Sequence, residues 1–239
     1  MPPDVTLILP AYNERGSIAR TIAEAVDFFT RRGSAYEIVV AADGDDGTRE
    51  LVSEMARQNP ALRVLGENAR RGKGRGIREA VAEAGGSIIG FADADNKVPI
   101  EEFDRFEPWF RQGYDAVIGS RARSDSRVER SQPFYRRLGG RGFHYFMQAV
   151  VGLPGISDTQ CGFKFFRRDV AKELFRRQRI DGYMFDVEIL SLALRLRYRV
   201  KEVPIRWRDD GDSRLALVRN NIRNVIDIFR IRFSRLKGD

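Results

Sequence analysis

Short apolar runs alternate with segments of helical spacing over residues 5–119, and this alternation limits the possible folds more than any other feature of the chain. The runs predicted as strands are residues 5–10, 36–42, 62–66, 87–92 and 115–120. The segments predicted as helices are residues 17–31, 47–58 and 72–84. Such an α/β alternation predicts a mostly parallel sheet with helices on both faces.

The pattern changes after residue 120, where strand signals become sparse and arginine becomes frequent. Further strands are predicted at residues 161–168 and 198–207, and a helix at residues 185–197. From Leu215 the chain reads as one helix to its end.

Polar residues stand directly after three of the predicted strands, in the segments 10–14, 43–47 and 93–97. Ligands of open α/β sheets bind beyond the carboxyl ends of the strands, so these segments are the candidate site. Asp93 and Asp95, one residue apart, could hold Mg²⁺ or Mn²⁺ against the oxygens of a diphosphate. The alternative is that Asp93 and Asp95 have no metal-binding role, and are a loop aspartate and the cap of a helix that begins near Pro99.

The segment "RRGKGRG", residues 70–76, places glycines and cations at the start of a predicted helix. Its backbone amides, together with Lys73, could bind phosphate. The spacing matches neither the Walker A nor the Rossmann pattern. A plain helix N-terminus with solvated basic residues is the alternative.

Composition indicates a soluble globular protein, since 42% of the 239 residues are hydrophobic and 32% are charged. No apolar run approaches the roughly 20 residues of a membrane-spanning helix, and the first residues lack a signal-peptide pattern, so we expect a cytoplasmic protein. The single cysteine, Cys161, excludes an intrachain disulfide and is interpreted as buried packing. With His144 as the one histidine, a Cys/His zinc site is disfavoured.

The net charge of +8 is concentrated in two regions. Residues 119–145 hold seven arginines against two acids, and residues 213–239 hold seven basic residues against two acids. Such charge suits a polyanion, an anionic membrane or a phosphorylated substrate. A nucleic-acid partner is disfavoured by the acidic and glycine-rich strand ends. Solvated basic surfaces are the alternative for both regions.

The last predicted helix combines this charge with an apolar face. Its apolar positions are Leu215, Val218, Ile222, Val225, Ile226, Phe229, Phe233 and Leu236. A basic amphipathic helix suits a membrane interface. Packing of that face on the core is the alternative.

Several strings resemble the family 2 glycosyltransferases of the GT-A fold. In the first half these are "LPAYNE", "ADGDDGT", "RGKGRGIREA" and "FADAD", in that order. In the second half "GSR", "SDTQCGFKFFRRD", "FDVEIL", "EVPIRW" and "GDSRL" are similar to the polyprenyl-phosphate branch, and "DTQCGFK" favours its glucosyl members over its mannosyl ones.

The resemblance implies a role for individual residues. Together with Lys73, proposed above for phosphate binding, the expected nucleotide- and donor-binding residues are Pro10, Ala11, Tyr12, Glu14, Asp43, Ala94 and Arg214. The expected acceptor-binding residues are Arg121, Arg137, Arg141 and Gln160. Asp43 would hydrogen-bond the base, Arg214 would reach the donor diphosphate, and Arg121 would face the acceptor phosphate. Asp93 and Asp95 would form the catalytic metal-binding pair, with Asp95 the more direct ligand.

Two positions depart from the family pattern. Ala42 stands where relatives usually carry a first aspartate before "DG", which implies looser recognition of the base. Lys97 stands where mannose synthases can supply a further metal ligand, and a protonated lysine cannot ligate a metal.

The implied activity is metal-dependent, inverting transfer of a hexose, with glucose favoured, from a nucleotide-diphosphate sugar to dolichyl or polyprenyl phosphate. The cofactor would be Mg²⁺ or Mn²⁺, and the enzyme would be peripheral on the cytoplasmic membrane face. Alternatives are a mannose synthase using GDP-mannose and a family 2 transferase with a soluble acceptor. The expected organisation is a GT-A domain over 1–214, with a nucleotide-sugar half (1–119) and an acceptor half (120–214) that includes a basic loop, followed by an amphipathic helix over 215–239.

Overall fold

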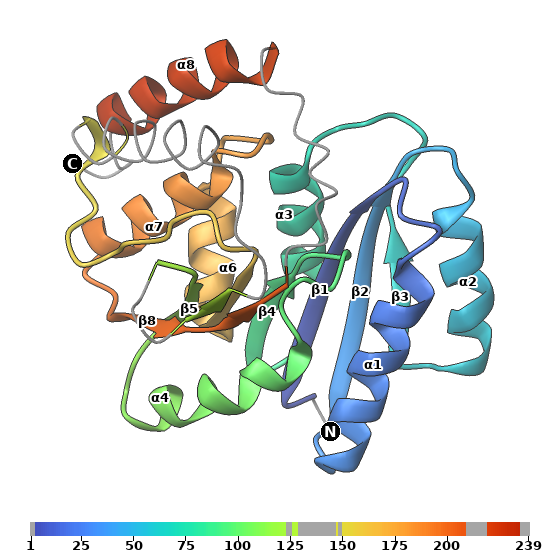
Figure 1. Cartoon of the computed structure of the whole chain (residues 1–239). Helices are drawn as coiled ribbons and strands as arrows, with labels where there is room; N and C mark the ends of the chain where they lie inside the picture. Colours follow the sequence, from blue (N-terminus) through green and yellow to red (C-terminus); the bar gives the residue numbers. More distant parts are fainter. Residues whose placement is uncertain (1–2, 123–125, 129–146, 148–149, 209–218, 235–239) are drawn as a thin grey trace.

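The computed structural model describes residues 3–122, 126–128, 147, 150–208 and 219–234, and a seven-stranded sheet lies at its centre (Figure 1). The strand order is β3-β2-β1-β4-β7-β5-β8. The strands are β1 (Val5–Tyr12), β2 (Tyr36–Asp43), β3 (Leu62–Leu65), β4 (Ile88–Ala92), β5 (Ala116–Ser120), β7 (Phe163–Arg167) and β8 (Val200–Pro204). A second, two-stranded sheet pairs β6 (Arg127–Val128) with β9 (Arg206–Trp207).

The predicted mostly parallel sheet is confirmed, with β7 as the exception. Strand β7 runs antiparallel to β4 on one side and to β5 on the other, whereas the remaining pairs are parallel. The stretch 198–207, predicted as one strand, is divided between β8 and β9, which belong to different sheets. Strand β7 therefore inserts a late segment of the chain between two early strands.

Helices cover both faces of the sheet because side chains alternate along each strand. In β1, Leu7 and Leu9 pack in one buried cluster with Ile22 of α1 (Ile18–Arg31), whereas Ile8 packs in the other with Ile77 of α3 (Lys73–Glu83). Helices α2 (Thr48–Gln58) and α4 (Glu107–Arg111) and the 3₁₀ helix η1 (Ile100–Arg105) belong to the α1 side. Helices α6 (Arg168–Arg177), α7 (Phe185–Arg195) and α8 (Arg219–Phe233) belong to the α3 side.

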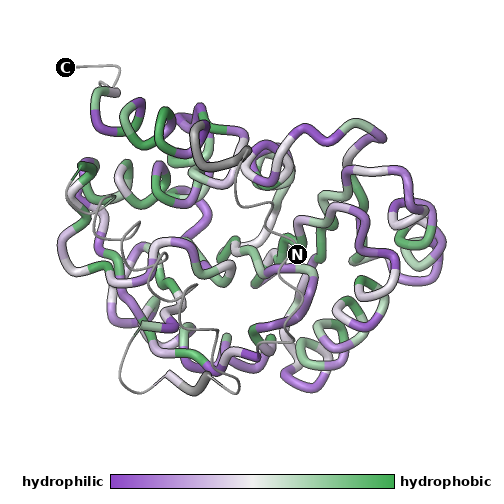
Figure 2. The backbone as a smooth tube through the Cα atoms, turned by 45° about the horizontal axis from the view of Figure 1, so that its top comes forward, coloured by the Kyte–Doolittle hydropathy of each residue, from purple (hydrophilic) through white to green (hydrophobic). Residues whose placement is uncertain are grey.

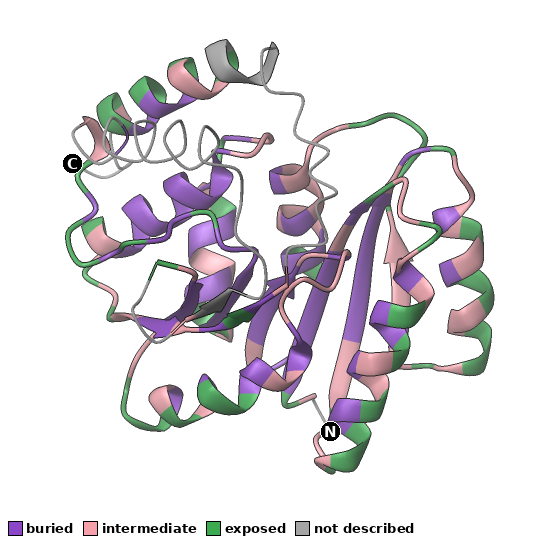
Figure 3. Ribbon diagram, in the orientation of Figure 1, coloured by how far each residue is buried: buried purple, intermediate pink, exposed green. Residues whose placement is uncertain are grey.

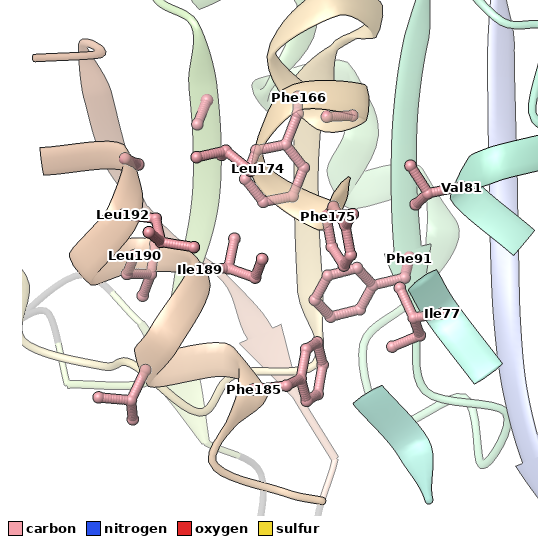
Figure 4. Close-up of a cluster of buried hydrophobic side chains, with 14 of the residues drawn as sticks. Ile77, Val81, Phe91, Phe166, Leu174, Phe175, Phe185, Ile189, Leu190 and Leu192 are labelled. Carbon is pink, nitrogen blue, oxygen red and sulfur yellow. The ribbon is translucent and has the colours of Figure 1, made fainter. Parts of the chain in front are cut away.

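The two clusters account for most of the core. Figure 3 shows buried residues along the strands and exposed ones on the outer sides of the helices, and Figure 2 shows hydrophobic and hydrophilic residues alternating along the helices. Figure 4 shows the α3-side cluster, in which Phe91 of β4 lies among aromatic and aliphatic side chains from α3, α6 and α7. Phe91 meets Phe175 and Phe185 with ring centroids 6.5 and 5.6 Å apart.

Some helices differ from the sequence prediction. The first three helices and α7 lie where they were expected, whereas α4, α6 and η1 were not predicted. The last helix ends at Phe233 rather than continuing to the end of the chain, since Ser234 is not helical. The predicted division of the chain at residues 119/120 and 214/215 stays a prediction.

Helix α8 has two apolar faces, which corrects the prediction of one. Ile228 and Ile231 are buried in the α3-side cluster with residues of α7. Ile226, Phe229 and Phe233 are 47%, 43% and 75% exposed. In the described part of the chain, no helix combines the length and the apolar character needed to cross a membrane.

Candidate active site

Three predicted strand ends meet at one edge of the sheet. Strand β1 is parallel to β2 and β4, its two neighbours. Tyr12 at the end of β1 is opposite Asp43 at the end of β2, and Asp93 follows the last residue of β4. Helices α1 and α3 lie on opposite faces at this point, which is the switch point where α/β sheets bind ligands.

Asp93 is fixed by β7 and α3 as well as by its own strand. Its backbone N–H donates to the carbonyl of Gly162 at 3.0 Å. A side chain on Gly162 would place its Cβ 2.0 Å from Oδ2 of Asp93, so a larger residue there would force this carboxylate to move. Lys73 at the start of α3 donates to Oδ1 of Asp93 at 2.5 Å.

Lys73 therefore binds a carboxylate in the structure as it stands, whereas the sequence predicted a contact with phosphate. Its side chain is 19% exposed. Burial favours the neutral amine, but attraction to Asp93 and then to Asp186 outweighs this effect and raises the pKa of Lys73 above its usual value. The ammonium is thus held charged beside the strand end, where a phosphate group would meet it.

Asp95 lies two residues further along the same loop and pairs with Lys97. Its Oδ2 is 3.2 Å from Nζ of Lys97, and its Oδ1 accepts from the backbone N–H of Lys97 at 3.3 Å. Ala94 between the two aspartates is buried, and its carbonyl accepts from Thr21 at 2.8 Å. The buried Ala94 anchors the loop, while the carboxylates of Asp93 and Asp95 remain 41% and 38% exposed.

The two carboxylates fit a hard divalent cation in ligand chemistry. Among the described residues, no group of three or more histidine, cysteine or acidic side chains could hold a metal. Mg²⁺ is commonly bound through one or two carboxylates, with phosphate oxygens of the substrate and water as the other ligands. Asp93 and Asp95 would supply the two carboxylate ligands of such a site.

The end of β1 combines an exposed aromatic ring with a cation. Tyr12 is 41% exposed, and the guanidinium of Arg70 lies 4.3 Å from its ring centroid. Arg70 also donates to the hydroxyl of Tyr183 at 3.1 Å. Of the other residues predicted in this loop, Pro10 is half-buried and Ala11 is buried in the α1-side cluster.

Glu14 is held by contacts within its own loop and with α2. Its backbone N–H donates to the Thr48 hydroxyl at 3.0 Å, and its carboxylate accepts from the Ser17 hydroxyl at 2.8 Å. The contact with Ser17 fixes the Glu14 side chain at the start of α1.

Asp43 joins the end of β2 to the glycine-rich loop. Its Oδ2 accepts from the backbone N–H of Arg71 at 2.8 Å. The preceding Ala42 is buried, and a side chain on Gly66 would place its Cβ 2.0 Å from the carbonyl of Ala42. The backbone at Gly66 therefore packs tightly against the backbone of Ala42 at this strand end.

Arg121 forms a two-pronged ion pair with Asp158. Its Nε is 2.7 Å from Oδ2 of Asp158, and one terminal nitrogen lies 2.9 Å from Oδ1. Burial favours a neutral carboxyl, but Arg121 outweighs this effect and lowers the pKa of Asp158. Glu202 of β8 accepts from the backbone N–H groups of Ser157 and Asp158 at 3.0 and 2.8 Å, which fixes the loop.

The remaining predicted residues are divided between this loop and the undescribed segments. Gln160 is exposed, and its backbone N–H donates to Oδ1 of Asp158 at 3.3 Å. Arg137, Arg141 and Arg214 lie outside the described residues. Cys161 is buried, as expected, and burial raises the pKa of its thiol to about 12.

Sequence reasoning missed the buried charges behind the site. Lys164 of β7 is fully buried and lies 2.6 Å from Oδ1 of Asp186 at the start of α7. The one available signal was a lysine inside an otherwise apolar strand, "FKFF". The pairing with Asp186 depends on tertiary contacts.

The mostly parallel sheet with helices on both faces is the GT-A fold of glycosyltransferases. The chain belongs to the glycosyl transferase family 2, whose model matches residues 6–175.

Curated relatives carry a narrower description. A dolichyl-phosphate beta-glucosyltransferase of Trichomonas vaginalis is 34% identical over 95% of this chain and 70% of its own length. The enzymes of the same description from Dictyostelium discoideum and Saccharomyces cerevisiae are 33% and 31% identical over 98% of this chain, and over 75% of their own lengths.

Solved structures share the fold at lower identity. Mannosyl-3-phosphoglycerate synthase from Rubrobacter xylanophilus superposes with a TM-score of 0.70 at 18% identity, over 96% of this chain and 72% of its own. Glucosyl-3-phosphoglycerate synthase from Mycobacterium tuberculosis, in a complex with Mn²⁺, UDP and phosphoglyceric acid, gives a TM-score of 0.65 at 20% identity, over 96% of this chain and 78% of its own. At these identities the likeness concerns the fold.

Proposed function

We propose that the protein transfers a hexose, with glucose favoured, from a nucleotide-diphosphate sugar to a dolichyl or polyprenyl phosphate, with inversion and with Mg²⁺ or Mn²⁺. The observation that carries the proposal is the match, over nearly the whole chain, to enzymes named dolichyl-phosphate beta-glucosyltransferase. A diphosphate leaving group needs positive charge, which the lysine would supply directly and the two carboxylates would supply by holding a divalent cation.

In this reaction an oxygen of the acceptor phosphate attacks the anomeric carbon of the sugar. The bond from that carbon to the β-phosphate oxygen breaks, and the nucleoside diphosphate leaves with the bonding electrons. A phosphate monoester has its second pKa near 6, so the attacking oxygen is already anionic near neutral pH. The reaction therefore depends on positioning and charge stabilisation more than on a strong protein base.

Each proposed residue has a task that its position supports. Asp93 and Asp95 would hold the divalent cation, which neutralises charge on the leaving diphosphate when it is bound. Lys73 adds a fixed positive charge beside Asp93. On the acceptor side, Arg121 has its orientation set by the buried Asp158, and its guanidinium would bind the lipid phosphate.

A matrix of donors and acceptors tests the proposal. UDP-glucose, UDP-galactose and GDP-mannose are each incubated with a short polyprenyl phosphate or with 3-phosphoglycerate, in the presence of Mn²⁺, Mg²⁺ or a chelator. We expect transfer from UDP-glucose to the polyprenyl phosphate, loss of transfer with the chelator, and a β-linked product by NMR. Transfer to 3-phosphoglycerate alone would exclude the lipid acceptor, and an α-linked product would exclude inversion.

Two alternative functions are a mannose synthase and a transferase with a soluble acceptor. A mannose synthase using GDP-mannose is disfavoured because Lys97 pairs with Asp95 at 3.2 Å, which puts a cation where a further metal ligand would stand. A soluble phosphorylated acceptor is supported by the shared fold with the phosphoglycerate synthases. The same matrix separates both alternatives from the lipid acceptor.

Helix α8 supports the further proposal that the enzyme binds an anionic phospholipid surface, on the cytoplasmic face of a membrane. Its exposed face presents Ile226 and Phe233 beside the exposed Arg223 and Arg230. Apolar side chains flanked by arginines suit insertion at the level of anionic head groups.

A further inference from the structure

Lys164 is a charged residue at the centre of the sheet. Strand β7 lies between β4 and β5, and Lys164 is opposite Phe91 on one side and Ile118 on the other. Its side chain has no exposed surface. A buried ammonium is costly unless it is paired and hydrogen-bonded, so the contacts of Lys164 must be specific.

The contacts of Lys164 join β7 to α7. Its Nζ donates to Oδ1 of Asp186 and to the backbone carbonyl of Cys161, both at 2.6 Å. The Asp186 side chain is only 5% exposed. These two bonds tie the first turn of α7 to the chain that enters β7.

Both ends of this pair reach residues of the proposed donor site. Phe185, which precedes Asp186 at the start of α7, has its ring centroid 6.0 Å from the Lys73 ammonium. The loop entering β7, which Lys164 holds at Cys161, continues to Gly162, against which the carboxylate of Asp93 packs. These contacts connect the buried pair, Lys164 and Asp186, to Lys73 and Asp93 at the strand ends.

We propose that Lys164 and Asp186 are positioning residues, an ion pair that sets the positions of Lys73 and the Asp93 carboxylate for the donor diphosphate. Asp186 fixes the start of α7, where Phe185 packs near the Lys73 ammonium, and Lys164 acts on Asp93 through the Cys161–Gly162 backbone. This inference rests on the proposed donor site, because Lys164 and Asp186 are buried behind the strand-end residues that form it. Ion pairs buried in a core can often be replaced by apolar residues without loss of stability, so stability alone gives no reason for this pair.

The test uses the single variants Lys164→Met and Asp186→Asn and the double variant Lys164→Met/Asp186→Leu, which removes both charges together. Glu188→Gln is the matched control, since Glu188 is a buried carboxylate on the same helix that accepts from the backbone N–H groups of Arg179 and Ile180. For each full-length protein we measure the thermal midpoint, UDP binding with Mn²⁺ by calorimetry, and kcat for hexose transfer.

We expect the double variant to fold, with UDP binding weakened about tenfold, as for groups that orient metal ligands. We expect kcat to fall about 100-fold, the scale of a misplaced reacting group. The control should lower the thermal midpoint while UDP binding and kcat stay within about twofold of wild type.

A folded double variant with wild-type UDP binding and kcat overturns the proposal. If the double variant does not fold, the near-isosteric Asp186→Asn variant decides by the same two measurements. A wild-type protein that binds UDP but transfers no hexose would contradict the proposed function, and the effect of the variants on UDP binding would still decide this inference.

Discussion

The ammonium of Lys73 and the carboxylate of Asp93 lie 2.5 Å apart and join the start of α3 to the end of β4. The sequence separately predicted phosphate binding for the lysine and metal binding for the aspartate. In the proposed function, the donor diphosphate and its metal would enter a site where these two opposite charges already pair with each other. Each partner would then exchange a contact with the other for a contact with the ligand.

The carboxylate pair is tested by Asp95→Ala and Asp93→Ala. We expect either change to lower kcat by at least about 100-fold, because the leaving diphosphate loses stabilisation of its charge. Transfer is measured at saturating Mn²⁺. Asp27→Ala, which removes a surface carboxylate paired with Arg31 on α1, is the control and should keep wild-type activity. Near wild-type turnover by Asp95→Ala would contradict a metal-binding role for the loop of residues 93–97.

The acceptor role of Arg121 is tested by Arg121→Ala. Loss of one charge-assisted contact should raise the KM for the lipid phosphate by the equivalent of about 1.5–3 kcal/mol and leave the KM for the sugar nucleotide nearly unchanged. Because the change also leaves Asp158 buried without its partner, a thermal melt is needed to show that the variant folds. An unchanged lipid KM with a large donor defect would move Arg121 to the donor site.

The Arg121–Asp158 pair also predicts a pH dependence of stability. The lowered pKa of Asp158 means that its ionised form stabilises the fold at pH values above the ordinary aspartate pKa of about 3.9. That contribution is lost as the pH falls through the lowered value in the folded protein. The difference in thermal midpoint between wild type and Asp158→Asn should therefore be largest near neutral pH and shrink below about pH 4. A constant difference down to pH 2 would contradict this assignment.

Membrane binding is tested on the exposed face of α8. Deletion of the whole helix would not isolate this face, because Ile228 and Ile231 are buried and their loss would expose the core. We instead expect Ile226→Ser/Phe233→Ser to weaken flotation with anionic vesicles while the thermal midpoint and UDP binding are retained. Salt should weaken binding of the wild type, because each basic residue near the surface contributes about 1 kcal/mol that is screened.

Ile231→Ala is the control for this test, since it should lower stability by about 2–5 kcal/mol through a cavity and leave vesicle binding of the folded protein unchanged. If the wild type ignores anionic vesicles at low salt, the membrane proposal fails while the glycosyltransferase assignment stands.

The local pattern of the sequence determined the strands and helices of the first half and the acidic ends of its strands. Alternation of apolar residues reports which side of a strand is buried, and this information lies within a few residues. The motif strings also indicated the family, and three of them, "LPAYNE", "ADGDDGT" and "FADAD", lie at the ends of β1, β2 and β4. Asp93 was therefore found as a candidate before any contact was known.

Only the tertiary structure decided what surrounds Asp93. Strand β7 pairs antiparallel with β4, which places Gly162 against the carboxylate and Lys164 beside Phe91. Pairing between strands far apart in sequence depends on the packing of the whole sheet, and no local period encodes it. The same reason explains α8, whose helical spacing was readable although the choice of Ile228 and Ile231 as its buried face depends on its contact with α7.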